Sequence, residues 1–281
     1  MSARTGSANR NLLQRVVTGV LGGAAIIALV LHGGVIGARA LAALLALCMN
    51  WEYGSMAYKL SDRRIKRGLL IMLTLAVSVA QFFDRLPVYD TAVVAFLILF
   101  AWYLFAAGRQ AEGHHLPVHL QELGYSFFGL FYLGFLPLYL VWLMELDNGP
   151  KWILLFFLIV WMGDTGGYFG GRFLGKRKLY PAISPKKTWE GYATGLLFSL
   201  GVAAAFKHIY FVEPAWSTVL TIAFVVNACA QVGDLCESLV KRAFDKKDSG
   251  SIIPGHGGFL DRFDAVVFTL PIMYICVTVL S

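Results

Sequence analysis

The sequence predicts an all-α, polytopic integral membrane protein with about nine transmembrane helices. Three observations predict this fold class. Of the 281 residues, 58% are hydrophobic and only 15% are charged, whereas a soluble domain carries about 25% charged residues. The mean hydropathy is +0.65, and apolar runs of membrane-spanning length recur along the chain. These properties exclude an ordinary soluble enzyme, a disordered chain and a disulfide-linked scaffold.

The expected spans follow from length, because a helix that crosses a bilayer needs roughly 20 mostly apolar residues. Nine segments qualify: 16–32, 37–58, 68–84, 88–107, 122–144, 151–170, 191–207, 215–240 and 260–280. Only residues 32–36 join the first two, which predicts a short or tilted pair. The fifth contains Gly129, Gly134 and Pro137, which favours a kink.

The basic residues predict the orientation of these spans. If the N-terminus lies in the cytoplasm, four of the 24 Lys and Arg residues face the opposite side, namely Arg39, Arg85, Lys151 and Lys207. The other 20 lie on the cytoplasmic side, as the positive-inside rule requires. This bias accounts for most of the net charge of +7 without any nucleic-acid partner. It also favours an odd number of spans, with the C-terminus on the side opposite the N-terminus.

No long linker or low-complexity segment interrupts the chain. We therefore expect a single membrane domain over 1–281. Within it, 1–150 supplies the N-terminal spans, and 151–281 supplies the C-terminal spans with the cytoplasmic loops that carry the candidate site. Small-residue pairs such as Gly19 and Gly23 allow helix packing within one subunit or between two, which leaves a homodimer open.

Six acidic residues lie inside or at the entrance of the predicted spans, where acids are costly and usually functional. They are Glu52, Asp164, Asp234, Glu237, Asp261 and Asp264. The first three are each seven or eight residues from the next basic residue on the cytoplasmic side. At 1.5 Å per residue, this places them about 10–12 Å below the cytoplasmic boundary. Since the last two open the ninth span from that side, acids of four helices are expected at one shallow depth.

Carboxylates that converge at one depth need a countercharge. Oxygen ligands suit hard divalent cations, so the acids predict one or two Mg²⁺ ions, with a monovalent ion as a further option. A proton or Na⁺ pathway is the rival interpretation. A pathway should continue across the membrane, however, and the outer halves of these spans contain almost no ionisable residues.

The first cytoplasmic loop combines glycines with cations. Residues 170–176 fit the pattern G-x-x-x-x-G-K, but Arg177 follows where a P-loop has Ser or Thr, and a membrane helix precedes it. We therefore reject a P-loop. Ser184 and Pro185 predict a helix N-cap followed by proline at the first helical position. Lys186 and Lys187 would then lie in the first turn, where a bound anion offsets their conflict with the helix dipole.

The second cytoplasmic loop, residues 238–264, carries the most specific pattern. It resembles the signature of the CDP-diacylglycerol synthases (phosphatidate cytidylyltransferases). The matching residues are Ser238, Lys241, Arg242, Lys247, Asp248, His256, Gly257, Gly258, Asp261, Arg262 and Asp264. Asp164-Thr-Gly and residues 184–191 resemble a second family stretch, so the similarity runs from about residue 161 to residue 264.

The resemblance implies that CTP and phosphatidic acid react to give CDP-diacylglycerol and pyrophosphate. An anionic oxygen of the phosphatidate would attack the α-phosphorus of CTP, and pyrophosphate would leave in line. Repulsion between anions is then the main barrier, which metal ions and fixed cations lower. The enzyme would be multi-pass in a bacterial inner membrane, with its active site facing the cytoplasm.

The candidate residues divide by chemistry. Asp234 and Asp261 are the expected principal metal ligands, and Asp164 is the next candidate. Asp264 and Glu237 are further candidates, either as ligands or as residues that orient Arg262 or Lys241. The remaining candidates are expected to contact the phosphates of CTP, pyrophosphate or the lipid: Lys186, Lys187, Ser238, Lys241, Arg242, Lys247, His256, Gly257, Gly258 and Arg262. For His256, a bland role as a turn residue is an equal alternative.

Two other functions stay open at this point. A kinase that uses CTP to phosphorylate a lipid alcohol, such as a polyprenol, would need a general base for the hydroxyl group and would release CDP. An ion-coupled transporter predicts inverted repeats and polar groups at the bilayer midplane, and the sequence shows neither. The full signature favours the cytidylyltransferase.

Overall fold

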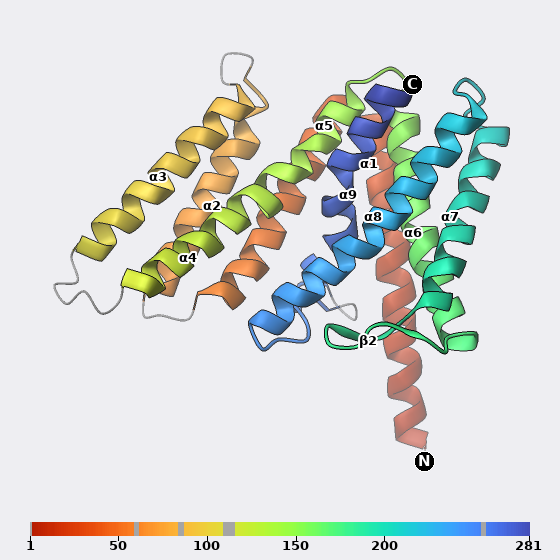
Figure 1. The fold of residues 1–281 in the computed structure, drawn as a ribbon, viewed down its shortest axis with the longest axis horizontal. Coiled ribbons are helices and arrows are strands. Elements are labelled where there is room, and N and C mark those ends of the chain that lie inside the picture. Colours follow the sequence, from red (N-terminus) through yellow and green to blue (C-terminus); the bar gives the residue numbers. More distant parts are fainter. Residues whose placement is uncertain (1, 59–61, 84–86, 109–115, 254–256) are drawn as a thin grey trace. The chain divides into compact units, whose positions relative to one another are not determined.

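The computed structural model describes residues 2–58, 62–83, 87–108, 116–253 and 257–281, which are mainly helical (Figure 1). They form two compact units: residues 1–29, 36–138 and 248–261 in the first, and residues 30–35, 139–247 and 262–281 in the second. The all-α membrane fold class is confirmed, with one small β-hairpin added.

The helices of the first unit come from the N-terminal half of the chain. They are α1 (Ser2–Ala57), α2 (Arg63–Ala80), α3 (Val88–Gly108), α4 (Leu116–Phe128), the π-helix η2 (Gly129–Phe135) and the 3₁₀-helix η3 (Leu136–Leu138). The second unit contains α5 (Tyr139–Met144), α6 (Gly149–Phe173), β1 (Lys178–Tyr180), β2 (Ser184–Thr188), α7 (Trp189–Ile209), α8 (Trp216–Ala243) and most of α9 (Leu260–Leu280).

Helix α1 reverses at Gly34, whose φ of 54° lies in the left-handed region that favours glycine. In a continuous helix, Leu29 and Gly37 would be about 12 Å apart along the axis. Here a Cβ atom on Gly37 would lie 3.2 Å from the carbonyl carbon of Leu29. The two limbs of α1 therefore correspond to the first two predicted spans.

In the described part of the chain, seven helices are long and apolar enough to cross a membrane, against the nine spans predicted. The difference has two causes. The first two predicted spans fall within one helix, counted once as Val17–Ala57. The third corresponds to α2, whose first five residues include four basic ones. The other predicted spans match α3, α4 to α5, α6, α7, α8 and α9.

The irregularity predicted in the fifth span is confirmed by η2 and η3, which interrupt the helix between α4 and α5. Glycine allows the close approach there. A Cβ atom on Gly129 would lie 2.8 Å from Oδ1 of Asn50 and 3.0 Å from Cε1 of Tyr53. The Asn50 side chain also donates to Thr74 Oγ1 at 3.1 Å. Close packing between α1, α2 and η2 thus forms the core of the first unit.

A buried ion pair lies in the first unit. The side chain of Lys66 is 0% exposed, pairs with Glu122 and lies 2.8 Å from a carboxylate oxygen of Asp62. The sequence placed Lys66 among the cytoplasmic charges that set topology. In the structure, Lys66 also joins α2 to α4. Its buried charge is tolerated there because it is paired.

Helices α6 and α7 form the closest helix pair of the second unit, because small residues line their contact. Such residues let two backbones approach closely in a membrane. A Cβ atom on Gly195 would lie 2.7 Å from the carbonyl oxygen of Gly163. Two side chains of α7 donate across this contact: Thr194 to Gly166 O at 2.9 Å and Ser199 to Ile159 O at 2.8 Å.

The connection between α6 and α7 corrects one prediction. Residues 184–188 are not the start of a helix: they form β2, which pairs antiparallel with β1. Helix α7 begins at Trp189, and Thr188 is its N-cap, accepting a hydrogen bond from Gly191 N at 3.1 Å. The N-cap prediction at Ser184 was therefore wrong. Lys186 and Lys187 lie in a strand, so the helix-dipole argument for an anion beside them fails.

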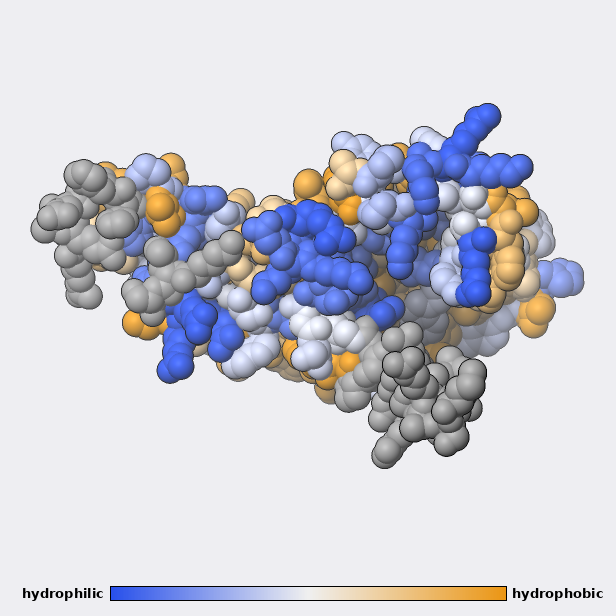
Figure 2. Space-filling model, turned by 90° about the horizontal axis from the view of Figure 1, so that it is seen from below, coloured by the Kyte–Doolittle hydropathy of each residue, from blue (hydrophilic) through white to orange (hydrophobic). Residues whose placement is uncertain are grey.

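The end of the helices near β2 in Figure 1 is seen face-on in Figure 2. Hydrophilic residues gather on this face, and apolar residues show at its margins. In the hairpin of β1 and β2, Lys178 and Lys186 are exposed. This distribution agrees with a polar surface at one end of apolar helices.

Candidate active site

Three aspartates predicted as metal ligands lie near one another in the second unit. Asp164 comes from α6, Asp234 from α8 and Asp264 from the first turns of α9. Asp234 is close enough to both other aspartates for their like charges to repel. Asp264 is also repelled by Glu237, and only 8% of Asp264 is exposed. Three helices thus deliver four carboxylates to one region, which we call the acid cluster.

Two cations balance the charge at Asp164 and Asp234. The Nζ atom of Lys187 lies 2.7 Å from Oδ2 of Asp234. Their side chains are 18% and 36% exposed, although the Nζ atom of Lys187 is itself buried. Lys187 and Arg262 both attract the carboxylate of Asp164. The hairpin strand β2 therefore brings a cation to acids on α6 and α8.

A second ion pair lies along α8. Glu237 is 2% exposed, and its Oε2 atom lies 2.6 Å from Nζ of Lys241 one helical turn later. This ion pair places Glu237 beside Lys241, one of the two basic residues that it was expected to orient. Ser238 Oγ lies 3.5 Å from Oδ1 of Asp234, at the limit of a hydrogen bond.

The acid cluster holds more carboxylates than cations. Its four carboxylates face three cations (Lys187, Lys241 and Arg262), which leaves one excess negative charge when all seven groups are ionised. Hard carboxylate oxygens are the ligands that Mg²⁺ prefers. No group of three or more His, Cys, Asp or Glu residues in the described ranges is already arranged around a metal position. Lys187 holds an oxygen of Asp234 that a metal would use.

The loop between α8 and α9, residues 248–259, belongs to the first unit, and we call it the signature loop. Oδ2 of Asp261, which follows the loop, accepts hydrogen bonds from Ser249 N and Gly258 N, both at 3.0 Å. Gly257 has a φ of 87°, which favours glycine, and pairs with Ile253 in an isolated β-bridge. His256 lies outside the described residues.

These contacts define what Asp261 and Gly258 do in the structure. Asp261 was expected as a principal metal ligand, and one of its oxygens here organises the loop that precedes α9. The Gly258 amide was expected near a phosphate, and here it donates to Asp261.

The sequence comparisons agree with the signature. Residues 13–280 match the model of the cytidylyltransferase family. The chain belongs to this family. A relative named phosphatidate cytidylyltransferase, from Bacillus subtilis (strain 168), is 32% identical over 275 residues, covering 96% of this chain and 99% of the relative.

Shorter matches with higher identity come from staphylococci. Relatives also named phosphatidate cytidylyltransferase are 46% identical over 143 residues in Staphylococcus saprophyticus and 48% identical over 132 residues in Staphylococcus aureus (strain COL). These alignments cover 51% and 46% of this chain, and 54% and 50% of the relatives.

Three other basic residues that were predicted to contact phosphates face solvent. Lys186, Arg242 and Lys247 are exposed. Arg242 donates to the carbonyl oxygen of Lys246 at 3.1 Å, where α8 ends. Exposure leaves these side chains accessible to an anionic substrate arriving from water.

Sequence reasoning missed one acid that shapes the hairpin. Glu190, in the first turn of α7, accepts hydrogen bonds from the backbone N–H groups of Lys176 (3.0 Å) and Arg177 (3.1 Å). It closes the base of the segment that carries Lys187. The available signal was an acidic residue in the first turn after a Thr N-cap.

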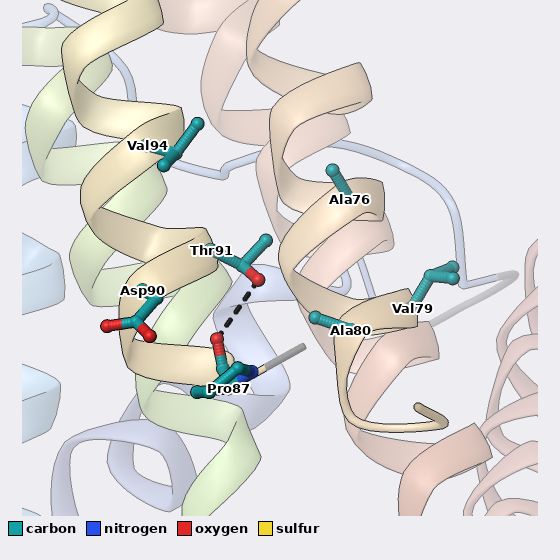
Figure 3. Close-up of a pocket in the computed structure, with 7 residues that line it drawn as sticks. All are labelled: Ala76, Val79, Ala80, Pro87, Asp90, Thr91 and Val94. Carbon is teal, nitrogen blue, oxygen red and sulfur yellow. Dashed lines mark hydrogen bonds between the residues drawn. The ribbon is translucent and has the colours of Figure 1, made fainter. Parts of the chain in front are cut away.

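A pocket lies between α2 and α3 in the first unit, and its lining includes none of the predicted site residues (Figure 3). Its volume is about 430 Å³, and its described lining consists of Ala76, Val79, Ala80, Pro87, Asp90, Thr91 and Val94. Thr91 donates to the carbonyl oxygen of Pro87 at 3.0 Å. This mostly apolar lining offers no cation to a phosphate among the residues named.

Proposed function

We propose that this chain transfers the cytidylyl group of CTP to phosphatidic acid, forming CDP-diacylglycerol and pyrophosphate. Its family and the name shared by its relatives support the reaction class and both substrates. The observation that carries the proposal is the acid cluster with its paired cations. It combines carboxylates, which can bind a metal ion, with lysine and arginine side chains, which can bind phosphate, as phosphoryl-transfer sites do.

The chain's own residues would act through charge and position. A phosphatidate oxygen forms the new bond to the α-phosphorus of CTP, and the bond from that phosphorus to pyrophosphate breaks. The attacking oxygen is already anionic, so no strong general base is required. Lys187, Lys241 and Arg262 would neutralise the phosphates, and fixed cations of this kind favour the charge that develops in the transition state.

The proposed cofactor is Mg²⁺, as one or two ions, held by Asp234 with Asp164 and Asp264. When bound, it would neutralise phosphate charge and align the leaving group. In the structure, Lys187 holds Oδ2 of Asp234 at 2.7 Å. We propose that the ammonium group of Lys187 leaves this oxygen and forms an ion pair with a substrate phosphate.

We propose that the chain crosses the membrane nine times. Two of these passes are the limbs of α1, and one is α2. The N-terminus and the active site would face the cytoplasm of a bacterial inner membrane. The excess of basic residues on that side supports this orientation. CTP would then arrive from the cytoplasm, and the lipid phosphate would lie at headgroup level.

The test uses purified protein in detergent with phosphatidic acid and labelled CTP. We expect CDP-diacylglycerol and pyrophosphate with Mg²⁺, and neither with EDTA. Asp234→Asn should lose activity, while Asp90→Asn, in the pocket of Figure 3, should retain it. Release of CDP with phosphorylation of an added lipid alcohol would instead identify the kinase. Ion flux in liposomes without either product would identify the transporter.

A further inference from the structure

Glu52 is a buried acid of α1 that the acid cluster of the second unit does not include. It is 2% exposed and lies in the first unit. An ionised carboxylate at such a position is costly unless it is hydrogen-bonded. Its partners therefore indicate why the chain keeps a carboxylate there.

Among the described residues, three groups donate hydrogen bonds to the carboxylate of Glu52. All three belong to the signature loop or to the residue that follows it. Ser249 Oγ donates to Oε2 at 2.9 Å, and Leu260 N donates to the same oxygen at 2.9 Å. Ile252 N donates to Oε1 at 3.4 Å. Both carboxylate oxygens thus hold the two ends and the middle of a loop about 200 residues later in the chain.

The loop is shaped to receive this carboxylate. A Cβ atom on Gly250 would lie 2.6 Å from Cδ of Glu52. A Cβ atom on Gly258 would lie 2.7 Å from Oε2 of the same residue. Real Cβ atoms essentially never show such distances. The approach of Glu52 accounts for glycine at position 250, whereas at position 258 the side chains of Ser249 and Asp261 crowd the same space as Glu52.

We propose that Glu52 is a positioning residue, which anchors the signature loop and thereby fixes the start of α9. The consequence for catalysis rests on the proposed function. Asp261, Arg262 and Asp264 follow the loop directly in the chain, so its conformation sets where α9 begins. Glu52 acts on the loop and not on the metal, because both of its oxygens accept hydrogen bonds from loop donors.

The first test is hydrogen–deuterium exchange of the full-length protein in detergent. Glu52→Gln keeps the size of the side chain but turns an N–H₂ group toward a donor. We expect faster exchange in peptides covering residues 248–260, and unchanged exchange in the hairpin of β1 and β2. Glu52→Asp retains the charge and should restore much of the protection.

Glu122→Gln is the matched control, because it also removes a buried, paired carboxylate from the first unit. It should lower the melting temperature without changing exchange in residues 248–260. Ser249→Ala removes one donor to Glu52 and should cause a smaller acceleration. It also keeps the test decisive should Glu52→Gln fail to fold.

The second test is steady-state kinetics on the same variants. Glu52→Gln should lower kcat by roughly tenfold or more, since each 1.4 kcal/mol lost from the arrangement of the site costs a factor of ten. KM for CTP should change less, and Glu52→Asp should recover part of kcat. A residue needed for stability alone would alter the folded fraction and leave kcat per folded molecule unchanged.

Unchanged exchange in residues 248–260 of both Glu52→Gln and Ser249→Ala would overturn the anchoring role. Faster exchange with unchanged kcat would overturn its link to catalysis. If the wild-type protein forms no CDP-diacylglycerol, the proposed function fails, and the exchange experiment still decides whether Glu52 anchors the loop.

Discussion

The contact between α6 and α7 gives a sharp prediction, because one added methyl group meets backbone on the opposite helix. In Gly195→Ala, the new Cβ atom would lie 2.7 Å from the carbonyl oxygen of Gly163. A relaxed contact needs about 3.5 Å. The two helices must therefore separate by several tenths of an ångström, and neither contacting group is a flexible side chain.

The expected cost has two parts. Overpacking a close contact costs about 1–3 kcal/mol. Separation also stretches the hydrogen bonds from Thr194 to Gly166 O (2.9 Å) and from Ser199 to Ile159 O (2.8 Å), and interhelical hydrogen bonds in membranes are worth about 0.6 kcal/mol each. Together the two parts come to about 1–4 kcal/mol. At about 2–4 °C per kcal/mol, we expect the apparent Tm to fall by roughly 2–16 °C.

The assay is thermal unfolding in detergent followed by tryptophan fluorescence. Gly201→Ala is the matched control on the same helix, since a Cβ atom there meets nothing within 4 Å. It should be neutral or stabilising by up to about 1 kcal/mol, because alanine favours helix over glycine. Equal Tm values for the two variants would refute the packing argument.

Three further predictions concern charge. Lys187→Met should lower kcat/KM by roughly 100-fold or more, as loss of a fixed charge-stabilising donor does. Lys186 is exposed, so Lys186→Met should have a much smaller effect. Equal losses in the two variants would contradict the assigned contact with Asp234. Chelation by EDTA should abolish product formation and added Mg²⁺ should restore it, so full activity in EDTA would exclude the proposed metal. The hydrogen bond from Lys151 lowers the pKa of Glu213. A lowered carboxyl pKa adds stability above the unfolded-state pKa of about 4.3, and this stability is lost as the pH falls. Glu213→Gln should thus lower Tm more at pH 7 than at pH 3, and an equal difference at the two pH values would point to another cause.

The helices were predictable because apolar length is a strong signal in membrane proteins. The predicted spans 88–107 and 260–280 agree closely with α3 and α9. The β-hairpin was missed because Ser184-Pro185 also fits a helix start. The Thr188 N-cap shows that the cap lies four residues later, where an acidic residue occupies the first turn.

The contacts of the candidate site were less predictable, since they join residues distant in the chain. The depth argument grouped Glu52 with the other acids, but depth along a helix does not specify which way a side chain points. Glu52 points to the signature loop in the first unit, whereas Asp234 contacts Lys187 in the second. The sequence counted Lys66 only among the cytoplasmic charges and did not indicate its partner, because Glu122 lies 56 residues away.

Asp234 and Asp261 looked equivalent in the sequence, yet their partners differ in kind. The carboxylate of Asp261 accepts two hydrogen bonds from backbone N–H groups, which move only if the loop moves. The carboxylate of Asp234, whose side chain is 36% exposed, contacts the amino group of the Lys187 side chain. A lysine can rotate to a phosphate without disturbing a helix or a loop, so Asp234 can exchange its partner during a reaction cycle. Asp234 is therefore the better suited of the two to bind a metal when substrate arrives, and Asp261 the better suited to hold the loop throughout.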